Sequence, residues 1–237
     1  MEEKLIIFMH IPKTGGTTLN SIFRGSFSEN EIYDHIEIEK MSKQYNQLSE
    51  AEKKAIKAVS GHHSHGVHEI FSRPYTYFTM LREPVSRVIS LYYFLKNYPG
   101  YYEDNMRNMS FEEYIDWDPQ AKNGQTLQIC GSIKNLNVEK AKENLKTFDV
   151  VGITEMFNES LYLLKKNYGW DNVNYKKKNI TKARPSLQQI PIKTIKKIEQ
   201  QNQLDIELYS FVKSSLTNRV NLLSHTDREE IKKINAN

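Results

Sequence analysis

The chain has very little cysteine and no long apolar run, and both absences narrow what it can be. Cys130 is the single cysteine among 237 residues, so the chain cannot form an internal disulfide or a cysteine-based metal site. We expect Cys130 itself to be a packed structural residue. No stretch approaches the roughly 20 apolar residues that a membrane-spanning helix needs. The first residues carry mixed charges and no cleavage signal, so we expect no signal peptide and a cytoplasmic protein.

A strong charge of one sign is also missing. The net charge is +4, a mild excess that suits an anionic ligand but does not argue for nucleic acid. The densest basic stretch, residues 175–184, lacks the interleaved aromatic residues that are typical of single-strand binders. No zinc-finger, helix-turn-helix or RNA-recognition motif is present. Nucleic acid is therefore not an expected partner.

No internal repeat, low-complexity tract or flexible linker divides the sequence. With 38% hydrophobic and 26% charged residues, it has the composition of a globular protein, and it is long enough for one sizeable core. We therefore predict one domain over residues 1–216. The remaining residues, 217–237, are polar and are expected to form a short helix or to be partly disordered.

What the chain does have is a run that joins an apolar strand, residues 5–9, to a segment that can be helical, residues 17–27. The run reads His10-Ile11-Pro12-Lys13-Thr14-Gly15-Gly16-Thr17-Thr18. A glycine turn at this place presents backbone N–H groups and the positive end of the helix dipole to an anion, and glycine lets the backbone approach closely. The run therefore predicts an anion-binding loop. The alternative is an ordinary turn with a solvated lysine.

This loop is not a Walker A motif. In that motif the lysine follows the last glycine, whereas Lys13 precedes both glycines and no glycine lies five residues ahead of it. The order of residues is therefore compatible with an anion-binding loop but differs from the phosphate-binding loop of P-loop nucleoside triphosphatases.

Further strands alternate with amphipathic helices along the chain. Apolar and aromatic stretches predict strands at residues 58–60, 75–81 and 148–153. Residues 48–58 are expected to be helical, with Ser49 as N-cap and Glu52 completing a capping box. Thr154 is expected to cap the helix after the last strand. The alternation predicts an α/β domain in three layers, with a central, mostly parallel sheet flanked by helices.

Residues with candidate chemistry follow three of the predicted strands. Lys13 follows the first strand, His62 the second and Arg82 the third, where Pro84 opens a helix that carries Ser86, Arg87 and Ser90 on its polar face. In open parallel sheets, ligands bind at the carboxyl ends of the strands. The three strand ends are therefore expected to meet at one rim.

Histidines are concentrated just after the second strand. His62, His63, His65 and His68 fall within seven positions. A histidine near its ordinary pKa suits a general base, and His62 is the preferred candidate by its position at the strand end. His63 and His65 are its competitors, and a structural role is the alternative. Pairs in this cluster could share a metal, but no aspartate or cysteine accompanies them, so no metal site is expected.

These motifs give the chain a resemblance to the PAPS-dependent sulfotransferases, of the carbohydrate type that includes heparan sulfate 2-O- and 6-O-sulfotransferases. Residues 10–18 look like that family's 5′-phosphosulfate loop. Residues 81–93 look like its 3′-phosphate motif, in which an arginine and a serine eight positions later hold the 3′-phosphate, here Arg82 and Ser90. Gly61-His62 resembles the segment that carries the catalytic histidine in the 2-O type. The chain looks like a soluble, bacterial relative without the membrane anchor of the animal enzymes.

The resemblance implies a P-loop-like fold and a definite reaction. A sulfuryl group would move from PAPS to a hydroxyl of a carbohydrate acceptor, leaving PAP, with no metal needed. His62 would be the base and Lys13 would stabilise the leaving oxygen. The implied nucleotide-binding residues are Lys13, Thr14, Gly15, Gly16, Thr17, Thr18, Arg82, Ser90 and Arg184. Arg184 lies in a basic loop, residues 176–184, that either covers the nucleotide or is a solvated run of charge.

Two other functions stay open at this point. One is a kinase-like phosphotransferase with an unusual loop order, and the other is an inactive nucleotide-binding scaffold. Against the kinase stands the absence of a clear aspartate-bearing strand for Mg²⁺. Residues 98–122, rich in aromatic and acidic residues, are expected to form a lid or an insertion facing the substrate. The sequence carries no signal for the oligomeric state.

Overall fold

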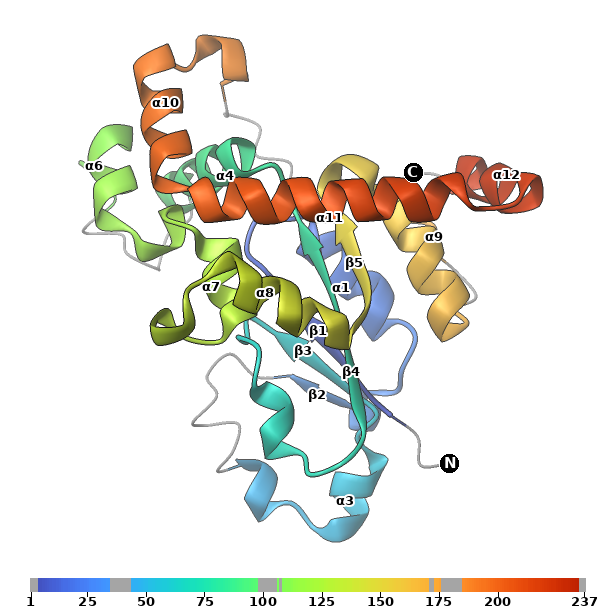
Figure 1. Ribbon diagram of the computed structural model, residues 1–237. Coiled ribbons are helices and arrows are strands. Elements are labelled where there is room, and N and C mark those ends of the chain that lie inside the picture. Colours follow the sequence, from blue (N-terminus) through green and yellow to red (C-terminus); the bar gives the residue numbers. More distant parts are fainter. Residues whose placement is uncertain are drawn as a thin grey trace.

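Five strands form one sheet in the centre of the molecule, in the order β2-β3-β1-β4-β5 (Figure 1). The computed structural model describes residues 4–34, 44–97, 106, 108–170, 173–175 and 185–234. Each neighbouring pair of strands is parallel, which confirms the predicted sheet. The strands are β1 (Leu5–Met9), β2 (Ile32–Asp34), β3 (Ala58–Gly61), β4 (Tyr75–Leu81) and β5 (Phe148–Ile153). β2 was not predicted, because this edge strand is only three residues long and half-buried at most.

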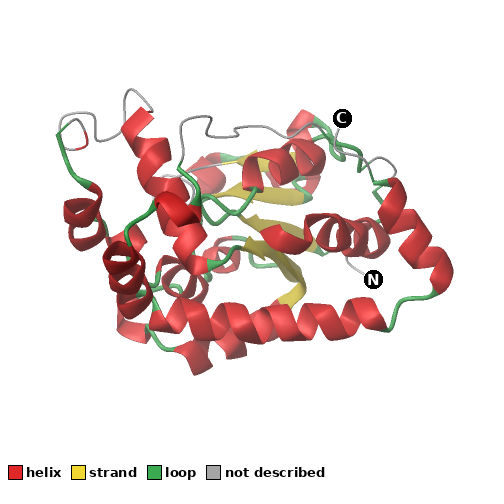
Figure 2. Cartoon of the chain, turned by 90° about the horizontal axis from the view of Figure 1, so that it is seen from above, coloured by secondary structure: helices red, strands yellow, loops and turns green. Residues whose placement is uncertain are grey.

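Helices cover both faces of the sheet, so the predicted three layers are confirmed (Figure 2). α1 and α9 lie on one face, while α7, α8 and α11 pack together across the other (Figure 1). α4, α6 and α10 form a smaller group beside the sheet. The described helices are α1 (Gly16–Arg24), α3 (Glu50–Ala55), α4 (Pro84–Asn97), α6 (Phe111–Trp117), α7 (Gly124–Cys130), α8 (Val138–Asn144), α9 (Phe157–Tyr168), α10 (Ile192–Gln201), α11 (Gln203–Asn221) and α12 (His225–Lys233).

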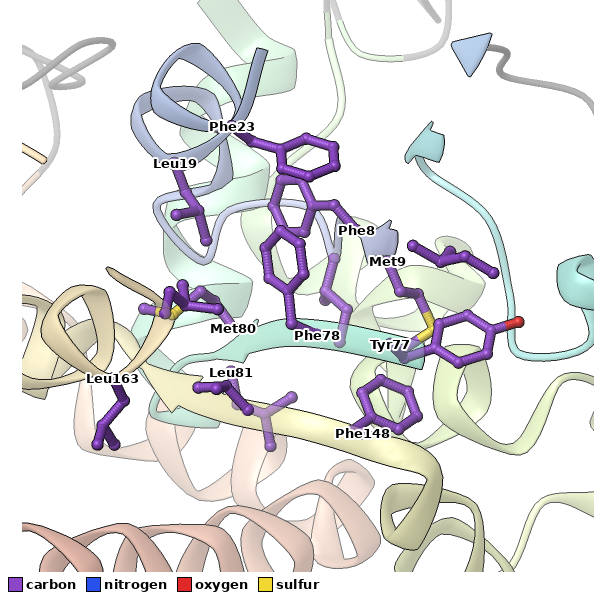
Figure 3. Packing of buried hydrophobic residues seen from close by; sticks show 14 of the residues in the cluster. Phe8, Met9, Leu19, Phe23, Tyr77, Phe78, Met80, Leu81, Phe148 and Leu163 are labelled. Atoms are coloured by element: carbon purple, nitrogen blue, oxygen red, sulfur yellow. The ribbon is translucent and has the colours of Figure 1, made fainter. Parts of the chain in front are cut away.

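The main core is built on alternating side chains of the central strands. Phe8 of β1 stacks on Phe78 of β4 at a ring distance of 4.7 Å, and Phe23 of α1 meets Phe78 edge-on at 5.2 Å (Figure 3). Tyr77 points to the opposite face, as alternation in a strand requires, and stacks on Phe148 of β5 at 4.9 Å. β1 and β4 are thus held from both sides. Loops that leave their carboxyl ends start from rigid positions.

A second, smaller core holds α4, α6 and α10 together. It contains Val88, Ile89, Tyr114, Ile115 and Ile198, all buried. The predicted lid, residues 98–122, is described only in part, and its described portion, α6 and the turn that follows it, packs into this core. Tyr92 and Tyr114 are therefore packing residues. Tyr98, Tyr101 and Tyr102 lie outside the described residues.

Of the two helix caps predicted from the sequence, one is present and one is not. α3 begins after Ser49, and Ser49 and Glu52 form the predicted capping box. The prediction that Thr154 caps the next helix is wrong. Its hydroxyl instead lies 2.8 Å from the Thr14 carbonyl oxygen and 3.0 Å from the Leu81 carbonyl oxygen. Thr154 is the first residue of a single 3₁₀ turn that precedes α9, and its hydroxyl joins the end of β4 to the loop after β1.

The C-terminal region is helical well past residue 216. That position falls within α11, and α12 follows and packs on α9. Ile231 and Ile234 belong to the main core, and Asp227 pairs with Lys166 of α9 at 2.9 Å. The domain boundary at residue 216 stays a prediction, but the described residues beyond it are part of the packed structure. Among the described residues no helix has the length and apolar character that a bilayer crossing requires.

Candidate active site

The loop between β1 and α1 has a backbone that few residues adopt. Lys13 and Gly15 have φ angles of 69° and 82°, in the left-handed region that favours glycine. The Thr14 hydroxyl donates to the Ile11 carbonyl at 2.8 Å, and Thr14 is completely buried. The hydroxyl of Thr154, the first residue after β5, reaches the Thr14 carbonyl and fixes the loop from below. Thr14 therefore shapes the loop from beneath, and its hydroxyl is already used within the loop.

Gly16 is needed because a histidine ring fills the space beside it. A Cβ added to Gly16 would lie 2.0 Å from Cδ2 and Nε2 of His10. The ring of His10 is itself stacked on Phe8, with 5.3 Å between the ring centroids. His10 was not among the residues predicted to form the site, although it is the first residue of the loop motif. Its signal was a polar residue directly after a buried strand.

We expect Gly16→Ala to destabilise the protein by about 1–3 kcal/mol, because the new methyl group must displace the His10 ring or the loop. Gly25→Ala, at the other end of α1, is the matched control, since its Cβ would meet nothing closer than 3.4 Å and its φ is −67°. Urea unfolding of both variants measures the difference. Equal free energies of unfolding would contradict the close approach.

His62 leans on the same loop from the end of β3. Its Nδ1 lies 2.8 Å from the carbonyl oxygen of His10, and the two imidazole rings are 4.3 Å apart. A carbonyl oxygen only accepts, so Nδ1 carries the hydrogen. The neutral ring then has its lone pair at Nε2. His62 is exposed and lines the cleft described below, so it is placed as a proton acceptor requires.

The other three histidines of the cluster point elsewhere. His63 is buried, with Nε2 at 3.2 Å from the Ser60 carbonyl. His65 packs on Tyr77, and burial lowers its pKa to about 4. His68 stacks on Tyr75 at 3.9 Å. None of the three lines the cleft, and among the described residues no group of three or more His, Cys, Asp or Glu side chains is arranged to hold a metal.

The pKa of His10 is lowered to about 3, first by burial and then by the nearby positive charges of His62 and Lys13. In the unfolded chain its pKa is about 6.5. As the pH falls from about 6.5 toward 3, the unfolded state therefore binds a proton that the folded state does not, and the free energy of unfolding falls. We expect His10→Gln to lose less stability over this range than the wild type. Urea unfolding at pH 7 and pH 4.5 measures this, with exposed His225→Gln as control; equal losses in wild type and His10→Gln would contradict it.

Arg82 and Ser90 lie next to the loop from the other side. Arg82 follows the last residue of β4, and its Nη1 donates to the Lys13 carbonyl at 3.1 Å. Ser90 is buried on α4 and faces the cleft. Lys13 itself lies over the ring of Phe94, also on α4, with Nζ 3.9 Å from the ring centroid. The predicted anion-binding residues, which come from two separate sequence motifs, therefore lie next to one another in space.

The predicted position of Arg87 on a polar helix face is wrong. The sequence placed it on the polar face of α4, but its side chain is completely buried. Its Nη2 lies 3.7 Å from the carboxylate of Asp205 on α11, which is equally buried. The partner comes from a residue 118 positions away, so periodicity along α4 could not reveal it.

One cleft of about 1020 Å³ at the carboxyl edge of the sheet collects these side chains. This size is at the upper end for small-molecule sites. Eight of the predicted site residues line it: Lys13, Gly15, Gly16, Thr17, Thr18, His62, Arg82 and Ser90. Thr14 lies beneath them, and Arg184 falls outside the described residues, as does the rest of the basic loop, residues 176–184.

Residues that the sequence analysis missed form the rest of the wall. They are chiefly His10, Phe94, Glu155, Phe157, Asn158 and Lys232. Lys232 comes from α12, and Asn158 links α12 to Tyr175, because its side chain donates to the Ile234 carbonyl and accepts from the Tyr175 hydroxyl. Phe94, Phe157, Asn158 and Lys232 carry no strand-end or glycine signal. Asn158 and Lys232 are found only once α9 and α12 are seen to pack together.

Comparison with known proteins agrees with this geometry. The sequence model of the Sulfotransferase family matches residues 1–212. Heparan-sulfate 6-O-sulfotransferase 2 of Gallus gallus is 25% identical over 200 residues, which cover 68% of this chain and 49% of that protein. Heparan-sulfate 6-O-sulfotransferase 1 of Homo sapiens is 21% identical over 196 residues, covering 67% and 47%. The chain spans about half the length, or less, of the curated relatives it matches.

A solved structure with a similar chain is mouse sulfotransferase SULT7A1 complexed with PAP. It has a TM-score of 0.43 and 14% identity, and the alignment covers 86% of this chain and 65% of that one. The family assignment does not depend on it. The family match covers most of the chain and includes the loop after β1, the end of β3 and the motif from Leu81 to Tyr93. The chain therefore belongs to the sulfotransferase family.

Proposed function

We propose that this protein transfers a sulfuryl group from PAPS to a hydroxyl group of a carbohydrate, leaving PAP. The observation that carries the proposal is that Lys13, His62, Arg82 and Ser90, from three strand ends and one helix, line a single cleft. Relatives named as heparan-sulfate 6-O-sulfotransferases favour a polysaccharide acceptor. We keep the cytoplasmic location and the covering role of Arg184 as predictions.

The donor nucleotide would be held by the two sides of the cleft. The amides at the start of α1 face the 5′-phosphosulfate, except that of Thr18, which already donates to the Gly15 carbonyl at 3.2 Å. The hydroxyls of Thr17 and Thr18 can add hydrogen bonds. Arg82 presents a planar guanidinium that can bind the 3′-phosphate with two parallel hydrogen bonds, and Ser90 adds a hydroxyl. A 3′-phosphate thus separates PAPS from ATP at this site.

The acceptor would react through an in-line displacement. Nε2 of His62 takes the proton from the acceptor hydroxyl as its oxygen forms a bond to sulfur. The bond between sulfur and the bridging phosphate oxygen breaks, and the electron pair stays on that oxygen. Lys13 stabilises the negative charge that grows there. The protein positions the reactants and stabilises the developing charge, as enzymes of phosphoryl transfer do. The positive charges are supplied by the side chains of Lys13 and Arg82.

Transfer assays test the proposal directly. Purified protein is incubated with ³⁵S-labelled PAPS and a panel of desulfated polysaccharides, and both labelled polysaccharide and released PAP are measured. We expect PAP to form in proportion to labelled product and only when an acceptor is present. A protein that binds PAP but labels no acceptor in the panel would favour the inactive scaffold instead.

A further inference from the structure

The side chain of Gln125 holds the backbone of Arg82 at two points. Its Nε2 donates to the Arg82 carbonyl at 3.0 Å, and its Oε1 accepts from the Arg82 amide at 2.9 Å. Arg82 is the first residue after β4, where the sheet no longer fixes the peptide. Gln125 is buried, with 1% of its surface exposed. A primary amide carries a donor and an acceptor side by side, so it can match both groups of one residue.

Gln125 is itself fixed from α11. Asp205 accepts from the Gln125 amide at 3.2 Å and from the Thr126 amide at 2.7 Å, and it also accepts from the Thr126 hydroxyl at 2.7 Å. These bonds satisfy amides in the first turn of α7, which have no partner within the helix. The carboxylate is 1% exposed, so its position is set by these contacts and not by solvent. The backbone from which the Gln125 side chain extends is therefore rigid.

The negative charge of Asp205 is balanced by an arginine of α4, the helix that carries Ser90. Arg87 of α4 lies 3.7 Å from the Asp205 carboxylate and donates to the Gln120 carbonyl at 2.6 Å. A buried carboxylate without a cation would be strongly unfavourable, so Arg87 makes this arrangement possible. Arg87 is five residues after Arg82 and three before Ser90. One buried network therefore connects α11 and α7 to Arg82 and to α4, the helix that carries Ser90.

We propose that Gln125 is a positioning residue that sets the preference of this site for a 3′-phosphorylated nucleotide. By fixing the Arg82 peptide, it makes the guanidinium leave β4 toward the Lys13 carbonyl and the space between the loop and Ser90. Without it, the Arg82 peptide can rotate and the guanidinium loses its direction. Gln125 does not line the cleft, so it acts only through Arg82. The inference rests on the proposed function, which assigns Arg82 to the 3′-phosphate.

The test compares two nucleotides that differ by the 3′-phosphate, PAP and adenosine 5′-phosphate, by calorimetric titration of the full chain. Gln125→Met keeps the length of the side chain and removes both hydrogen bonds. We expect it to weaken PAP binding roughly tenfold and adenosine 5′-phosphate binding less than about twofold. Thr194→Val is the matched control, because it removes a hydrogen bond from a buried threonine to Glu112 without touching Arg82 or the Asp205 network. It should leave the ratio of the two affinities unchanged.

A double variant separates positioning from a general loss of structure. If Gln125 acts through Arg82, Gln125→Met adds no further loss of PAP affinity to Arg82→Ala. Equal weakening of both nucleotides by Gln125→Met, or additive losses in the double variant, would overturn the inference. If Gln125→Met does not fold, Gln125→Asn, which keeps the amide but is one methylene shorter, is judged by the same ratio.

A different set of results would show that the proposed function is wrong. If Arg82→Ala alone leaves the ratio of the two affinities unchanged, the assignment of Arg82 to the 3′-phosphate is wrong, and the inference on Gln125 falls with it. If Arg82→Ala abolishes the preference and Gln125→Met does not reduce it, the assignment of Arg82 stands and only the role of Gln125 is wrong.

Discussion

His62→Asn is expected to reduce kcat for sulfuryl transfer by about 10²–10⁴-fold while leaving PAP affinity nearly unchanged. Asparagine places an N–H near the position of Nδ1, so it can still donate to the His10 carbonyl, which His62 contacts at 2.8 Å. It has nothing at the position of Nε2, so the proton of the acceptor hydroxyl has no receiver. Steady-state kinetics with PAPS and the best acceptor measure the loss, and titration with PAP measures the affinity.

The control is the same substitution at His225, which is exposed at the start of α12 and outside the cleft. It should leave kcat at the wild-type value. An His62→Asn variant that keeps more than a tenth of the wild-type kcat would show that another group, or solvent, takes the proton. Because His63, His65 and His68 do not line the cleft, none of them is expected to replace it.

Lys13→Ala is expected to lower kcat by about 10²–10³-fold, because the charge that grows on the leaving oxygen loses its nearest cation. Alanine keeps a Cβ, so the left-handed φ of 69° at this position is no less favourable than with lysine. The variant should therefore fold normally, which thermal melting checks. Lys13→Arg keeps the positive charge and should recover part of the rate.

Lys54 on α3 provides the control, since it is exposed and lies outside the cleft. Its replacement by alanine changes the net charge by the same amount as Lys13→Ala and should leave kcat unchanged. A Lys13→Ala variant that loses PAP affinity but keeps kcat would mean that Lys13 binds the donor equally in the ground state and the transition state.

Most of the correct sequence-based predictions came from the motifs at the ends of the strands. A buried strand, a glycine turn and a helix start are local features, and β1, the loop and α1 have the predicted arrangement. Parallel pairing of β3, β1 and β4 then brought His62, Lys13 and Arg82 to one edge without any further information. The likeness to a family added the spacing between Arg82 and Ser90.

The residues that the sequence did not reveal depend on contacts between distant segments. His10 was overlooked because its role depends on packing against Gly16 and His62, and not on a pattern along the strand. Asp205 and Gln125 lie 80 residues apart in the chain and meet only when α11 crosses α7. Arg87 looked like a surface residue because its counter-charge comes from α11. Periodicity reports which face of an element is apolar and says nothing of such partners.

Binding of a nucleotide through its 3′-phosphate is the property of the cleft on which the proposed function depends most. The most direct measurement is a thermal-shift titration of wild type and Arg82→Ala with PAP and, separately, with ATP and Mg²⁺. A ligand that binds only the folded state raises the melting temperature. We expect PAP to stabilise the wild type, ATP to have no such effect, and Arg82→Ala to lose the stabilisation by PAP. Stronger stabilisation by ATP, or none by either nucleotide, would contradict it.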